Sequence, residues 1–233
     1  MIDRGRFIGA TAAALAAANA TSVQAQVPAD VPGTDPSLPK DVYAASRNRA
    51  PLITRDMIAS EENKAAYDGI MHGSTIAGMQ GPAGISLYST KINRLTAQLN
   101  VALRLQNGLD ARLSELAMIV ASREADSAFE WNAHASNAPH VGLESHIVDV
   151  VRDRKPTTGL GEKEAAIIAL GREAYGKHKV SPETFAAAQR LFGTETLVNL
   201  CLLMGNYMMT AGLLHAFDQQ LPPGVVSTLP GSN

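Results

Sequence analysis

The stretch DSAFEWNAH, residues 126–134, places three polar side chains at helical spacing. Ser127, Glu130 and His134 lie three and four residues apart, so an α-helix holds them within an arc of roughly 60° on one face. The side chains of Glu130 and His134 can then hydrogen-bond to each other. Because histidine exchanges its proton near neutral pH, this face predicts acid/base chemistry.

Glu115 is a further acidic residue that interrupts an apolar helical stripe. A carboxylate among core positions is costly unless it has a partner. A short link at residues 124–127 would fold the next helix back, so we expect Glu115 to face Glu130 and His134. Two ionised carboxyl groups side by side repel each other, so we expect one of them to stay protonated and act as an acid.

Two other interpretations of this cluster stay open. A Glu–His pair at this spacing also occurs where it only joins two helices or solvates a surface. The same three groups offer two oxygens and one nitrogen, a set that a divalent metal ion accepts, as in a metal-dependent lyase.

The elements that position the cluster are predicted to be helices throughout. Aromatic residues make up only 5% of the chain, and no alternating strand pattern of useful length occurs. Ser60, Ser89, Asp110 and Ser181 are predicted N-caps, and residues 72–86 are expected to form a Gly-rich loop. The expected helices cover about 60–73, 89–108, 110–124, 126–138, 143–152 and 162–178. A further helix is expected to begin at Ser181–Pro182, and a long one covers about 194–217. The fold class is therefore all-α.

The last helix, from about Thr194 to Phe217, is apolar on nearly all sides. Such a helix lies at the centre of a core or between subunits, so we expect a homo-oligomer, as a dimer, trimer or hexamer. Cys201 lies within this apolar run and is the chain's one cysteine, so we expect it to act as a small hydrophobic residue.

The N-terminal residues have the layout of a secretory signal peptide. Arg4 and Arg6 precede a short apolar run, and small residues allow cleavage after Ala25. We therefore expect a periplasmic or secreted protein, without membrane attachment after cleavage. The expected organisation is a signal peptide at 1–25, a Pro-rich extended leader at 26–52, a helical domain at 53–223 and a tail at 224–233. The net charge of −2 and the absence of Lys/Arg clusters argue against nucleic acid as a partner.

The central block LDARLSELAMIVASREADSAFEWNAHASNAPHVGLE resembles the carboxymuconolactone decarboxylase family, in the superfamily that contains the alkylhydroperoxidase AhpD. The similarity runs from about residue 50 to 223 and includes GPAGISLYS and LLMGNYMMTAGLLHAF. This resemblance implies an AhpD-like helical domain that forms oligomers.

The resemblance also assigns roles to the cluster. The two cysteines of the AhpD branch fall on Ser127 and Glu130, its histidine on His134 and its glutamate on Glu115. Without both thiols, dithiol peroxidase or disulfide reductase chemistry is excluded at this site. The resemblance instead implies a lyase that needs no cofactor and has His134, Glu130 and Glu115 as catalytic residues.

The implied reaction is loss of CO2, or a related isomerisation or hydrolysis, from a small carboxylated lactone or β-keto-type acid. It proceeds through an enolate that is protonated at carbon. Candidate substrate-binding residues are Ser127, Tyr88, Tyr207, Trp131 and Arg123, although Arg123 is also expected to neutralise Glu115. A different class of function, an exported helical oligomer that binds a small hydrophobic acid without turnover, remains open.

Overall fold

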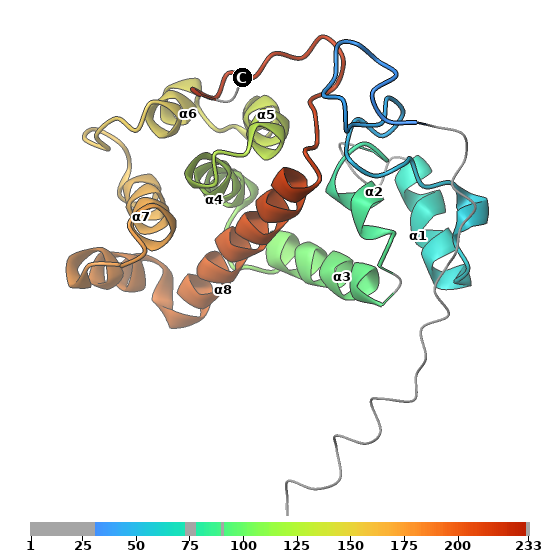
Figure 1. Cartoon of the computed structure of the whole chain (residues 1–233). Coiled ribbons are helices and arrows are strands. Elements are labelled where there is room, and N and C mark those ends of the chain that lie inside the picture. Colours follow the sequence, from blue (N-terminus) through green and yellow to red (C-terminus); the bar gives the residue numbers. More distant parts are fainter. Residues whose placement is uncertain (1–30, 73–77, 90, 232–233) are drawn as a thin grey trace, which may run out of the picture.

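The computed structural model describes residues 31–72, 78–89 and 91–231, and this part of the chain is helical without named strands, which confirms the all-α class (Figure 1). The predicted signal peptide lies outside the described residues. The α-helices are α1 (Glu61–Met71), α2 (Pro82–Ser86), α3 (Ile92–Leu105), α4 (Ala111–Glu124), α5 (Ala128–Asn137), α6 (Ser145–Arg152), α7 (Glu162–Gly171) and α8 (Pro182–Ala216). Short 3-10 helices cover Arg55–Met57 and Ala138–Val141, and a π-helical turn, Arg172–Gly176, extends α7.

Helix α4 is the centre of the fold. Every residue from Leu113 to Arg123 is buried, and α4 packs against α5, α6, α7 and α8 (Figure 1). A central helix has no solvent face, so its polar members must find partners inside the protein. Glu115 is one of these members, with 2% exposure.

The predicted helix starts are mostly confirmed. The side chains of Ser60, Asp110 and Ser181 accept hydrogen bonds from backbone N–H groups three residues later. The N-cap prediction for Ser89 is wrong, because Lys91 occupies the N-cap position of α3. The Gly-rich loop prediction is wrong over Pro82–Ser86, where proline at the first helical position begins the short helix α2.

The long helix α8 is buried on one side and exposed on another. Leu200, Leu203 and Met204 are fully buried, whereas Val198 and Leu202 are each 52% exposed. Within the described residues α8 is also the one helix long and apolar enough to cross a membrane, a property shared by core helices of soluble proteins. Here it packs against α3, α4, α5 and α7.

A second exposed apolar stripe lies on α3. Ile92, Leu95 and Leu99 are 45–54% exposed, and only Leu103 of the expected stripe is buried. The apolar period of this helix was therefore predicted correctly, but the described part of the chain leaves the stripe uncovered.

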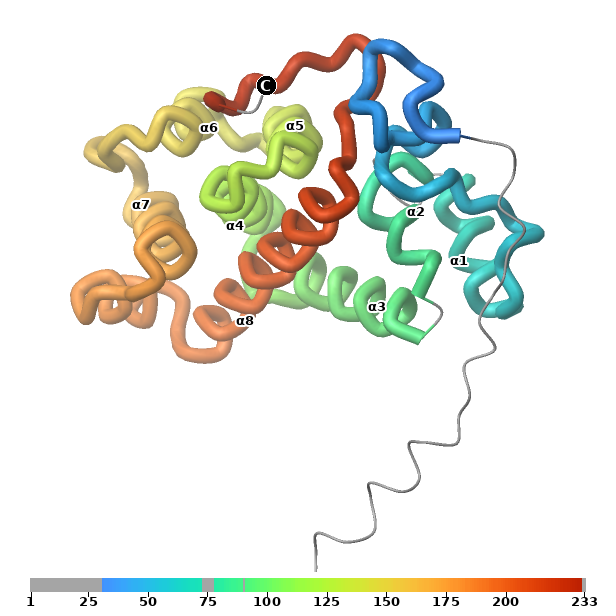
Figure 2. Tube along the Cα trace, viewed as in Figure 1, coloured from blue at the N-terminus to red at the C-terminus, as the bar shows by residue number. Residues whose placement is uncertain are grey.

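The two terminal segments pack together on one side of the helices. Residues 31–52, expected as an extended leader, instead form turns in which Val42 is fully buried. The C-terminal segment leaves α8, passes beside these turns and returns across α5 (Figure 2). Backbone hydrogen bonds from Arg49 to Phe217 and from Gln220 to Arg47 join the two segments, and Leu229 near the end is buried.

Candidate active site

Glu115 and His134 face each other across α4 and α5. The Nδ1 N–H of His134 donates to Oε1 of Glu115 at 2.7 Å, and Nε2 of His134 lies 3.5 Å from Oε2 of Glu130. All three side chains are at most 7% exposed. The structure therefore brings the three predicted groups together, with the imidazole between two carboxylates; we call these residues the Glu–His–Glu trio.

The position between two acids changes the proton affinity of the histidine. Burial disfavours the charged imidazole and lowers the pKa of His134, but the hydrogen bonds that His134 donates to Glu115 and Glu130, together with the charges of both carboxylates, outweigh this effect. The resulting pKa is raised from 6.5 to about 9. At neutral pH the imidazole of His134 is therefore protonated.

Tyr207 of α8 closes one side of the trio. Its ring lies edge-on to the His134 ring, with centroids 4.8 Å apart and an interplanar angle of 81°. Burial raises the pKa of Tyr207, against smaller lowering effects from the Arg104 charge and a hydrogen bond with Asn100. Its hydroxyl therefore stays protonated and can donate a hydrogen bond. Asn100 and Arg104 were missed by the sequence analysis, because both belong to a helix that carries no part of the motif.

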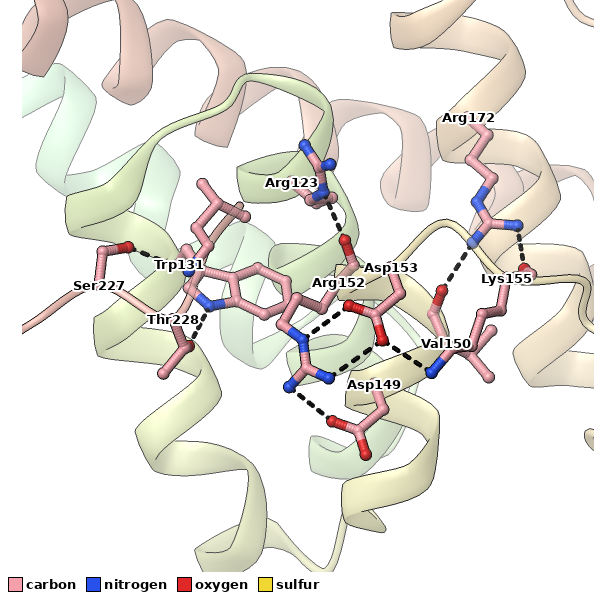
Figure 3. A network of polar contacts seen from close by, with 11 residues as sticks. Arg123, Trp131, Asp149, Val150, Arg152, Asp153, Lys155, Arg172, Ser227 and Thr228 are labelled. Atoms are coloured by element: carbon pink, nitrogen blue, oxygen red, sulfur yellow. Dashed lines mark hydrogen bonds and ion pairs between the residues drawn. The ribbon is translucent and has the colours of Figure 1, made fainter. Parts of the chain in front are cut away.

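Ser127 and Trp131 lie on the same helix as the histidine. Ser127 is the N-cap residue of α5, 1% exposed, and its Oγ has no hydrogen-bond partner within the described chain. Trp131 is fully buried and donates its indole N–H to Oγ1 of Thr228 at 2.9 Å (Figure 3). Trp131 thus attaches the C-terminal segment to α5, a contact that the sequence did not predict.

Arg123 does not pair with Glu115, so that prediction is wrong. Its Nε donates to the Arg152 carbonyl at 2.8 Å (Figure 3). A terminal nitrogen pairs with Asp126. The expectation failed because Glu115 already has His134 as its partner. Arg123 instead joins the C-terminal end of α4 to α6. Both of its contacts, with Arg152 and Asp126, are structural contacts within the protein.

Tyr88 has no hydrogen bond to the trio in the described chain. Its hydroxyl donates to the Pro51 carbonyl at 2.7 Å, and the side chain is 45% exposed. Cys201 is partly buried, and burial raises the pKa of its thiol, as expected for a cysteine that acts as a hydrophobic residue.

Protein-family models and curated proteins gave no match to this chain. Solved structures share its fold, among them the following two. One is a protein of unknown function from Agrobacterium tumefaciens, described as a candidate antioxidant defence protein AhpD, with 18% identity, a TM-score of 0.54 and coverage of 59% of this chain and 94% of that one. The other is a cysteine-to-alanine variant of the debrominase Bmp8 in complex with 2,3,4-tribromopyrrole, with 13% identity, a TM-score of 0.55 and coverage of 67% and 88%. The chain therefore has the AhpD-like all-α fold.

Proposed function

We propose that this protein is a cofactor-independent acid/base enzyme of the carboxymuconolactone decarboxylase type. The observation that carries the proposal is the buried Glu115–His134–Glu130 arrangement, with its 2.7 Å and 3.5 Å contacts. The fold is AhpD-like, and one protein that shares it is an enzyme acting on a small molecule. The proposed substrate is a small carboxylated lactone or β-keto-type acid, and the proposed reaction is decarboxylation or a related lactone isomerisation or hydrolysis.

In the proposed decarboxylation, the bond between the substrate carbon and its carboxylate breaks and CO2 leaves. The electron pair moves onto the adjacent carbonyl oxygen and gives an enolate. The His134 imidazolium then donates its proton to the carbon, a role suited to a group whose pKa is raised to about 9. Glu115 holds the ring through Nδ1, and Glu130, next to Nε2, can return a proton from water.

The oxyanion of the enolate needs a hydrogen-bond donor while CO2 leaves. We assign this role to the hydroxyl of Tyr207, which is held beside the His134 ring and stays protonated.

A metal-dependent reaction at the trio has less support. The two nitrogens of His134 face different carboxylates, so the three side chains do not converge on one shared point. Within the described residues, no group of three or more His, Cys, Asp or Glu side chains is arranged to hold a metal ion.

Binding without turnover remains the second candidate function. It is favoured by one observation. The trio is buried, and neither Glu130 nor His134 lines the surface cavity that residues 126–129 form with the two terminal segments. We further propose that the protein is exported to the periplasm or secreted, and that copies associate through the exposed stripes on α3 and α8.

The test is a screen of carboxylated lactones and β-keto acids for CO2 release, run with wild type and His134→Ala side by side. We expect wild-type turnover to fall by at least 100-fold in His134→Ala, while the helical content and thermal melt stay close to wild type. Cys201→Ser is the matched control and should keep wild-type activity. Turnover that survives His134→Ala, or that is lost in a folded Cys201→Ser protein, would show that the assigned chemistry is wrong.

A further inference from the structure

A surface cavity of about 830 Å³ lies where three parts of the chain meet. Its walls come from Asp35, Ser37, Leu38 and Arg47, from the link at 126–129, and from residues 214–215 and 218–227. Sites for small organic molecules commonly enclose about 300–1,000 Å³, so the size fits such a ligand. Ser127 lines the cavity and precedes Glu130 by about one helical turn, whereas none of the three trio residues lines it.

Ser127 presents an unused polar group at this position. Serine at an N-cap usually bonds a backbone N–H of the first helical turn. Here the side chain makes no such bond, and its buried Oγ has no partner within the described chain. The first N–H groups of α5 also lack partners inside the helix. A hydroxyl and a helix N-terminus together favour a ligand oxygen that carries negative charge.

Arg47 supplies a positive charge to the cavity wall. Its Nε donates to the Leu221 carbonyl at 2.7 Å, and with the described residues its guanidinium forms no ion pair. Asp35 is near enough for the Arg47 charge to lower its pKa slightly, as the smallest of several effects. The guanidinium therefore keeps donors for a ligand carboxylate.

The carboxylates that line the cavity are engaged elsewhere. Each has a partner other than Arg47: Asp35 accepts from Ser37, Asp126 pairs with Arg123, and Asp218 lies 3.8 Å from Arg49. None of the three forms an ion pair with Arg47, so its guanidinium stays open to a ligand carboxylate.

The backbone around the cavity is strained. Arg47, Asp126 and Asp218 have positive φ of 57°, 49° and 48°, and all three line the cavity. Within the described chain, two other non-glycine residues share this conformation. Such strain persists where surrounding contacts hold it, often at binding sites. Here the Arg47 carbonyl accepts from the backbone of Gln220 at 2.8 Å, which holds the two segments together.

We propose that this cavity binds a small carboxylic acid with an apolar body. The carboxylate pairs with Arg47, a second oxygen such as a ketone or lactone carbonyl bonds to Ser127 and the N-terminus of α5, and the apolar part contacts Phe129 and Leu214. This inference rests on the proposed function for its substrate class, and it deepens that function by naming the residues that hold the acid.

The test uses 3-benzoylpropionate, a γ-keto acid that does not readily lose CO2, and its uncharged amide as the matched probe. Affinities are measured by calorimetry on the full chain. The fluorescence of Trp131, the chain's one tryptophan, reports binding next to the cavity. We expect the acid to bind at least tenfold more tightly than the amide.

The variants separate the contribution of Arg47 to ligand binding from that of Ser127. Arg47→Gln should remove the preference for the acid, and Arg47→Lys should restore part of it. Ser127→Ala should weaken both probes several-fold, and Lys40→Gln, an exposed cation outside the cavity wall, should leave both affinities unchanged. Equal binding of acid and amide, or an unchanged preference in a folded Arg47→Gln protein, overturns the assignment. Since the probe is not turned over, this result is independent of whether His134→Ala abolishes CO2 release.

Discussion

The ring of Tyr207 meets the ring of His134 edge-on, with centroids 4.8 Å apart, and so joins the last long helix to the trio on α4 and α5. Edge-to-face pairs of this kind stabilise by about 0.5–1.5 kcal/mol beyond the area they bury. The contact comes from the ring, whereas the proposed support of the oxyanion comes from the hydroxyl.

Tyr207→Phe separates these two contributions. The ring contact survives, so we expect stability to fall by only about 1 kcal/mol, from the lost hydrogen bond with Asn100. Turnover should fall about 100- to 1,000-fold, as for loss of one oxyanion donor. Steady-state kinetics and urea unfolding check both effects, and a variant with full activity would remove Tyr207 from the mechanism.

The stability of the protein should depend on the charge of His134. Its pKa is raised from 6.5 to about 9 in the folded chain, so the protonated form stabilises the fold. This contribution, on the order of 3 kcal/mol, is fully present below pH 6.5 and is lost as the pH rises through 9. Urea unfolding between pH 6 and 10 should show this decline in wild type and a much smaller one in His134→Gln. Parallel curves for the two proteins would contradict the raised pKa.

The exposed stripes on α3 and α8 predict self-association. Leu99→Glu and Leu202→Glu each place a charge where wild type exposes a large apolar side chain, so we expect the assembly to dissociate. Val31→Glu changes an exposed apolar residue outside both helices and serves as the control. Light scattering gives the mass of each protein. A monomeric wild type, or an assembly that both helix variants leave intact, would contradict this prediction.

Gly171 marks a close approach of α7 to α4. A Cβ at this position would overlap a methyl group of Val120, so Gly171→Ala should destabilise the fold by about 1–3 kcal/mol. Gly212 is also helical but has open space around it, so Gly212→Ala should be neutral or stabilise by up to about 1 kcal/mol. Thermal melts of the two variants should therefore shift in opposite directions or differ by several degrees.

The trio was predictable from the sequence because its geometry is mostly local. Glu130 and His134 are fixed by helical spacing, and a buried acid such as Glu115 needs a partner across a short link. Arg123 was harder to predict, because sequence gives no way to rank Glu115 against Asp126 and the Arg152 carbonyl as its partners. The cavity was not predictable at all, because it depends on two terminal segments, distant in sequence, that pack together around Arg47 and Gln220.

Much of the fold was predictable from the capping residues and the apolar period, but α2 and the environment of the α3 stripe were not. A short helix such as α2 leaves too few residues for a periodic pattern, so the sequence predicts a loop over Pro82–Ser86. The stripe of α3 has the period of a buried face, and periodicity alone does not say whether the chain itself or another copy covers it.

Gly193 lies inside α8 with φ 74° and ψ 167°, values outside any helical region. An inserted residue in a continuous helix turns everything beyond it by about 100°, because each residue advances the spiral by that angle. Because the helix is interrupted at Gly193, a rotation of the residues before it is not transmitted to the residues after it. An insertion or deletion of one residue within 182–192, in related sequences or engineered variants, therefore leaves the orientation of Tyr207 toward the imidazole unchanged. The same change between residue 194 and Tyr207 would turn the tyrosine away.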